Sequence, residues 1–191
     1  MNKKGFTLIE LLAVIVILGI LLGIAIPRVS QYINDSKKKT FVDQAKLYID
    51  EVRHAATSEM YPLPIGTNEV TIVTLDKVKL EKNTERSPFG GKYLYNKSYV
   101  AIVNAGDGID TDYKYYFAAQ DSKDYAIPLT EETEINASKV IAKAKNKMEV
   151  TIQSLCGTPE GTTYNYGSIS GLTGSNWTAT IFSSDKCGKN D

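Results

Sequence analysis

The sequence predicts an α+β fold, in which one long N-terminal helix packs with its second half on an antiparallel β-sheet, followed by a C-terminal loop region. Three features predict this order. An apolar run occupies residues 6–26, an amphipathic helical pattern continues to about residue 59, and short β-rich segments separated by turn residues follow. The 191 residues suffice for one domain and an appendage, and 22 basic against 22 acidic side chains favour no strongly charged partner.

The apolar run has the length of a membrane-spanning helix. Its 21 residues would span about 31 Å as a helix, close to the hydrocarbon thickness of a bilayer. A secretory signal peptide has a shorter apolar region and a small-residue cleavage site, which Pro27-Arg28-Val29 does not provide. Basic residues after the run favour a cytoplasmic C-terminal side, whereas an even pair of cysteines favours an oxidising exterior. These two signals leave the orientation open.

Glu10 is an ionisable residue inside this apolar run. A carboxylate at such a position normally implies a partner or a function. The other interpretation is a side chain that reaches the lipid headgroups near the end of the helix. Further along, Gly19 and Gly23 have the small-xxx-small spacing of closely packed membrane helices, although glycine is common in such helices anyway. Together with Pro27 they mark a stretch of weak helix propensity.

The helical pattern continues beyond Pro27, which we expect to kink the helix rather than end it. We expect one helix from about Thr7 to Glu59, closed by Pro62 and Pro64. Apolar residues recur three and four positions apart in its second half, which predicts one buried face. The residues of this face are Phe41, Val42, Ala45, Tyr48, Ile49, Val52, Ala55 and Ala56.

Beyond residue 64 the pattern changes to short strands in an antiparallel meander, with Gly or Asp clusters between them. The expected strands are residues 70–73, 93–95, 98–103, 113–118, 125–127 and 177–182. Residues 137–147 (ASKVIAKAKNK) have a helix-forming composition. Cys156 and Cys187 enclose a Gly-rich region, and a disulfide between them would hold it in place; two reduced, buried thiols are the alternative.

The stretch Lys4-Gly5-Phe6-Thr7-Leu8-Ile9-Glu10, followed by the apolar run, resembles the class III leader of type IV pilins and the related pseudopilins. This resemblance implies that residues 1–5 are a leader, that residues 6–30 form a membrane and filament-core helix, and that residues 31–191 form a head. A membrane prepilin peptidase would cut the Gly5–Phe6 bond, and Phe6 would become the N-methylated N-terminus. In this family the head lies outside the cell.

The resemblance also gives Glu10 a partner. Cleavage before Phe6 would create a cationic amine one helical turn from Glu10, in the same chain or in the preceding subunit of a filament. The family further implies a homopolymer built by an assembly ATPase and a platform protein. In such a filament the stretch containing Gly19, Gly23 and Pro27 can unwind under load. The bridge Cys156–Cys187 would match the C-terminal disulfide loop of many type IV pilins.

Calcium is the one ion for which the sequence offers candidate ligands. Asp107, Asp110 and Asp112 place carboxylates at a turn, where oxygen ligands at alternating positions could hold calcium, although the spacing of this loop is not diagnostic. Major pseudopilins bind calcium, and residues 87–93 (SPFGGKY) loosely resemble their Asp-Pro-Trp-Gly segment, with Ser87 in place of its aspartate. Because Asp-Gly turns usually have no ligand, no cofactor remains the first expectation.

Three functions are compatible with these features. A pilin of an extracellular type IV pilus, supporting adhesion, motility or related surface behaviour, is favoured by the head size and the cysteine-closed tail. The alternatives are a major pseudopilin of a type II secretion or DNA-uptake system and a single-span binding domain that never polymerises. An enzyme is the least supported, since no nucleophile–base arrangement accompanies the single His54. The run Lys37-Lys38-Lys39 could contact lipid headgroups or DNA, but a charged run on a helix is usually solvated, so nucleic acid is unsupported as a partner.

Overall fold

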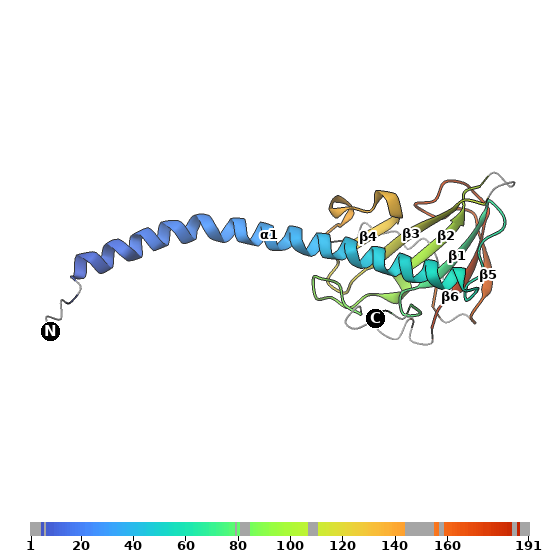
Figure 1. The fold of residues 1–191 in the computed structure, drawn as a ribbon, viewed down its shortest axis with the longest axis horizontal. Coiled ribbons are helices and arrows are strands. Elements are labelled where there is room, and N and C mark those ends of the chain that lie inside the picture. The colour runs from blue at the N-terminus through green and yellow to red at the C-terminus, as the bar shows by residue number, and fades with distance from the viewer. Residues whose placement is uncertain are drawn as a thin grey trace. The chain divides into compact units, whose positions relative to one another are not determined.

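The computed structural model describes residues 5, 7–78, 80, 85–106, 111–143, 155–156, 159–184 and 187. It divides into two compact units, Met1–Lys37 and Lys38–Asp191. Helix α1 (Leu8–Thr57) contributes to both units, and six strands form a mixed sheet in the second. The chain is therefore α+β, as the sequence predicts (Figure 1).

Helix α1 runs through Pro27 without a break and ends close to the expected residue. At its C-terminal end the backbone N–H of Glu59 donates to the carbonyl of Ala56 (3.1 Å), and that of Met60 donates to the carbonyl of Ala55 (3.0 Å). Glu59 has a left-handed backbone (φ 58°). This is a Schellman motif, so α1 is terminated by its own backbone bonds just before the two prolines.

The second half of α1 buries the face that its apolar spacing predicts. All the expected residues are buried except Ala55, which is half-buried. The ring of Tyr48 lies 6.1 Å from that of Tyr93 and 6.2 Å from that of Phe117, measured between centroids. Phe41 packs in the same way against Phe89 and Tyr93. The contact with Phe117 fixes α1 to one face of the sheet, and those with Phe89 and Tyr93 fix it to the connection between residues 74 and 99.

The sheet has the strand order β4-β3-β2-β1-β6-β5. Four of its neighbouring pairs are antiparallel, as expected, but β1 and β6 pair in parallel, with Ile72 opposite Ile181. The strands are β1 (Glu69–Thr74), β2 (Tyr99–Asn104), β3 (Tyr113–Gln120), β4 (Ala126–Glu131), β5 (Thr162–Tyr166) and β6 (Trp177–Phe182). Strand β5 was not expected from the sequence.

Both faces of the sheet are covered. Every residue of β2 is buried, because alternate side chains enter different cores. Val100 and Ile102 belong to the core against α1, whereas Tyr99, Ala101 and Val103 belong to a second core on the other face. The second core also contains Leu155, Ile169 and Trp177 from the C-terminal region. That region is therefore a packed layer of the domain.

Two local expectations are wrong in the described part of the chain. Residues 93–95 form no strand: Tyr93 makes only an isolated bridge to Asp121, and Tyr95–Lys97 is a 3-10 turn. Ala137–Lys139 is likewise a 3-10 turn, after which Ile141 pairs with Ala126 through two backbone bonds of 2.8 and 2.9 Å. This pairing holds the chain extended where composition favours a helix; residues 144–147 lie outside the described residues.

Candidate functional site

The first unit exposes a continuous apolar helix surface. Its large apolar side chains are exposed throughout, from 83% at Leu8 to 47% at Ile33. The most apolar window of α1 has a mean hydropathy of 3.0 and no buried residue, so α1 is long and apolar enough to cross a membrane. Apolar surface of this extent is a site for lipid or for other chains.

Glu10 lies at the start of this helix and has a partner within its own chain. The backbone N–H and the hydroxyl of Thr7 both donate to Oε2 of Glu10, each at 2.8 Å. In return, the backbone N–H of Glu10 donates to the Thr7 hydroxyl at 3.4 Å. Thr7 precedes Leu8, the first helical residue, so the pair forms a capping box with a negative charge at the positive end of the helix dipole.

Glu10 was interpreted from the sequence as a filament contact, and the capping of the helix by Thr7 was not predicted. The spacing Thr-x-x-Glu ahead of an apolar run is its sequence signature, and it was available in the sequence. The predicted pair between Glu10 and the amine of Phe6 stays a prediction, because Phe6 lies outside the described residues. Gly5, the residue before the expected cleavage point, is exposed and non-helical.

Gly19, Gly23 and Pro27 all lie inside α1. A Cβ built on either glycine meets no other atom within 4 Å, apart from atoms of its own helix and chain neighbours. Both glycines therefore offer flat helix surface that a neighbouring helix can approach closely. Pro27 has no backbone N–H, so one hydrogen bond of the helix ladder is missing at this position.

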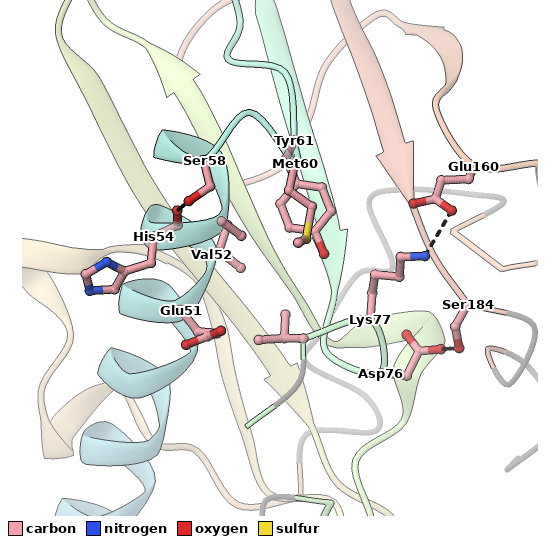
Figure 2. Close-up of a pocket in the computed structure, with 12 residues that line it drawn as sticks. Glu51, Val52, His54, Ser58, Met60, Tyr61, Asp76, Lys77, Glu160 and Ser184 are labelled. Atoms are coloured by element: carbon pink, nitrogen blue, oxygen red, sulfur yellow. Dashed lines mark hydrogen bonds and ion pairs between the residues drawn. The ribbon is translucent and has the colours of Figure 1, made fainter. Parts of the chain in front are cut away.

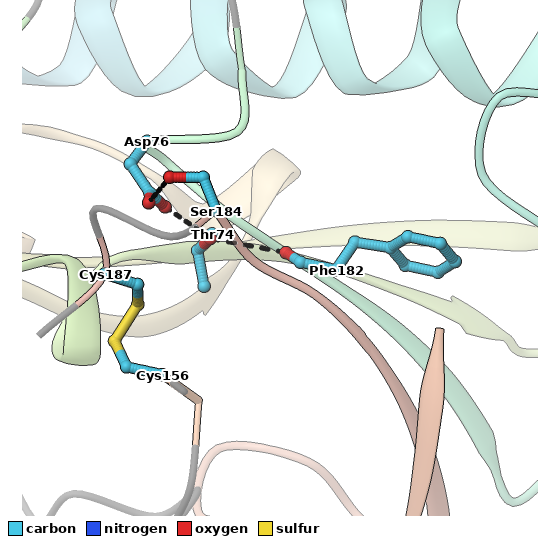
Figure 3. Close-up of a disulfide and its surroundings, with 6 residues drawn as sticks. All are labelled: Thr74, Asp76, Cys156, Phe182, Ser184 and Cys187. Atoms are coloured by element: carbon cyan, nitrogen blue, oxygen red, sulfur yellow. Dashed lines mark hydrogen bonds between the residues drawn. A yellow bond between two sulfur atoms is a disulfide. The ribbon is translucent and has the colours of Figure 1, made fainter. Parts of the chain in front are cut away.

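Cys156 and Cys187 form a disulfide, with their Cα atoms 4.9 Å apart and a sequence separation of 31 (Figure 3). The bridge encloses β5 and β6. Beside it, the carboxylate of Asp76 accepts hydrogen bonds from the hydroxyls of Thr74 and Ser184. The segment after β6 is thus attached both to the chain before β5 and to the end of β1.

The calcium hypothesis stays untested. Asp107 and Asp110 lie outside the described residues, and Asp112 is an exposed residue just before β3. Among the residues that the structure describes, no three His, Cys, Asp or Glu side chains are arranged to hold a metal ion.

The segment with the loose Asp-Pro-Trp-Gly resemblance is a buried turn held by Asp121. The Ser87 hydroxyl donates to the carboxylate of Asp121, which is fully buried. The same carboxylate accepts the backbone N–H groups of Lys123 (2.8 Å) and Tyr125 (2.9 Å). A Cβ on Gly91 would lie 2.7 Å from the carboxyl carbon of Asp121, so the close approach requires glycine. These bonds join the turn to the β3–β4 connection.

Comparison with known proteins identifies the N-terminal segment. Residues 1–26 match the family model described as a prokaryotic N-terminal methylation motif. No curated protein and no solved structure matches the chain. The matched segment contains the expected cleavage point, Glu10 and the apolar run, and it implies processing by a prepilin peptidase. The first 26 residues are therefore an N-terminal methylation motif, which begins with the class III leader found in type IV pilins and pseudopilins.

Proposed function

We propose that this chain is a structural subunit, a pilin, of an extracellular type IV pilus, which supports adhesion, motility or related surface behaviour. One observation carries the proposal: the methylation motif continues directly into a helix whose large apolar side chains are exposed. Such a helix requires lipid before assembly and neighbouring helices after it. The proposed subunit is a single-pass membrane protein first and a component of the cell surface afterwards.

In this proposal a prepilin peptidase cleaves the Gly5–Phe6 bond, and Phe6 becomes the N-methylated N-terminus. The charge of the amine persists, since a methylated secondary amine is still protonated. Its partner is Glu10, in the same chain or in the preceding subunit. A carboxylate accepts about four hydrogen bonds, so the two from Thr7 leave capacity for the amine.

The pair between Glu10 and the amine acts as a register device. Two buried charges that meet roughly balance their cost of desolvation, whereas a subunit docked at the wrong axial step leaves both charges unpaired. An assembly ATPase and a platform protein move the subunit out of the membrane. In the filament, the stretch of Gly19, Gly23 and Pro27 permits close helix packing and unwinds under load.

The test is the intact mass and N-terminal residue of this protein sheared from the cells that make it. We expect a chain that begins at methylated Phe6 in a filament fraction. A processed chain found only in membranes would replace the pilin by a pseudopilin of a secretion or DNA-uptake system. A chain that still carries Met1 to Gly5 would refute both and leave the membrane-anchored binding domain.

A further inference from the structure

A cavity of about 580 Å³ lies in the second unit, between the last turns of α1 and the segments that follow β1 and precede β5 (Figure 2). It is within the usual size range of ligand pockets. Val52, Ala55, Tyr61 and Val78 supply an apolar surface inside it. Nothing in the proposed chemistry of the leader uses this cavity.

The hydroxyl of Tyr61 adds one polar group to this apolar surface. Its side chain is only 3% exposed, and its ring packs against Phe182 with centroids 5.1 Å apart. Among the described residues, its hydroxyl has no hydrogen-bond partner. An occupant with an aliphatic body and a polar end would satisfy both features of this surface.

The rim of the cavity is acidic. Glu51, Asp76 and Glu160 line it, against Lys77. The Nζ atom of Lys77 is already bound to Glu160 at 2.9 Å. The pKa of Tyr61 is raised first by burial and then by the negative charges of Glu160, Glu51 and Asp76. All three carboxylates therefore affect the electrostatic potential at the Tyr61 hydroxyl in the cavity. The polar end of the occupant is therefore expected to be a cation.

The chain itself contains a segment with aliphatic stems that end in cations, as the cavity requires. Between Arg28 and Lys39 there are four basic residues and one acidic residue, whereas residues 40–191 hold 16 basic and 20 acidic residues. Lysine side chains combine a long aliphatic stem with a cationic end. Lys38 is half-buried and Lys39 exposed, both on α1. Their charge complements that of the cavity.

A chain cannot place these lysines beside its own Glu51. Glu51 follows Lys38 by thirteen residues in the same helix, which separates them by about 20 Å along the axis. This exceeds the combined reach of the two side chains. A contact between them must join two copies.

We infer that the cavity beside the C-terminal end of α1 is a docking site for a second copy of this chain and receives its Lys38 and Lys39. The inference rests on the proposed function, because the second copy is a neighbouring subunit of the filament. The lysine stems lie on Val52, Ala55 and Tyr61, and an ammonium group reaches Glu51.

The experiment is zero-length carbodiimide coupling of amines to carboxylates, applied to the sheared filament fraction and to the membrane fraction of the same cells. Peptide mass spectrometry then searches for a bond from Lys38 or Lys39 to Glu51. Because of the 20 Å separation within one chain, such a peptide identifies contact between two copies. We expect it in the filament fraction.

Charge reversal supplies the second readout. Glu51→Lys removes an exposed carboxylate that has no hydrogen bond or ion pair among the described residues, and lysine suits a helix, so the fold is retained. We expect this variant to yield roughly tenfold less filament, since it opposes like charges. Lys38→Glu with Lys39→Glu should do the same, and all three changes together should restore the yield. Asp43→Lys, the same charge change at an exposed α1 position away from the cavity, is the matched control and should keep the yield.

The outcomes separate this inference from the proposed function. Filaments without the cross-linked peptide, together with a normal yield for Glu51→Lys, would overturn the docking site and leave the pilin intact. Cross-linked dimers found only in membranes would overturn the pilus while supporting the docking site. Absence of both filaments and cross-links would overturn both.

Discussion

Removal of the disulfide is expected to destabilise the second unit strongly. The perturbation is the double change Cys156→Ala and Cys187→Ala, where alanine avoids placing a hydroxyl at the buried Cys187, which is 6% exposed. With a sequence separation of 31, the loop-entropy relation gives a loss of about 3.7 kcal/mol at 25 °C. This is a large fraction of the usual stability of a domain.

The unit should nevertheless fold without the bridge. Strands β5 and β6 remain paired with each other, and β6 remains paired with β1. The bonds from Thr74 and Ser184 to Asp76 also hold the segment after β6 independently of the disulfide. The free energy of unfolding, rather than the native structure, is therefore the quantity to compare.

Urea unfolding in detergent provides the assay. Trp177 is the single tryptophan, lies on β6 inside the bridged region and is 3% exposed, so its fluorescence reports on this unit. With a slope of about 2 kcal/mol per molar urea, the midpoint should fall by roughly 2 M. The unchanged chain under a reducing agent is the matched comparison, and its urea midpoint should equal that of the variant. A loss below about 1 kcal/mol would refute the chain-entropy reasoning for this loop.

Three further predictions concern single residues. Gly91→Ala should lower the free energy of unfolding by about 1–3 kcal/mol in the same urea assay, because its Cβ would meet the immobilised Asp121 carboxyl; native-like stability would contradict that packing. Hydrogen bonds from the backbone N–H groups of Gly66 and Ile65 lower the pKa of Glu69. The ionised Glu69 therefore contributes to folding stability at neutral pH, and this contribution is lost as pH falls below 4.5. Glu69→Gln should therefore show a shallower loss of stability in acid, and an unchanged pH profile would count against the bond. Glu10→Ala should abolish filaments while the second unit unfolds normally; normal filaments would end the register hypothesis.

Sequence periodicity predicted α1 well because a helix is a local structure. A repeat of three and four residues identifies the face that includes Phe41 and Val52 without knowledge of what covers it. Strand β5 was not predicted, because it lies at the edge of the sheet and contains no run of apolar residues. Its sequence, TTYNY, alternates between half-buried and exposed positions.

Pairing between distant segments was not predictable in the same way. The parallel contact of β1 with β6 joins residues more than a hundred positions apart, and neither strand differs in composition from an antiparallel one. Asp121 is a second example of a contact between distant segments that its sequence does not predict. Its sequence neighbours suggest an ordinary turn, whereas its partner Ser87 comes from another connection. The acidic cavity is likewise formed by segments that only the fold brings together.

The two covered faces of the sheet explain why the C-terminal region and the helix serve different purposes. The second half of helix α1 covers one face of the sheet, whereas the large apolar side chains of its first half are exposed. The other face depends on Leu155, Ile169 and Trp177, which belong to a region with few apolar residues. A small core of this kind gains most from a covalent bridge, because the bridge reduces the entropy that the region loses on folding. The disulfide therefore stabilises the layer opposite the helix, while the exposed apolar half of α1 takes no part in either core.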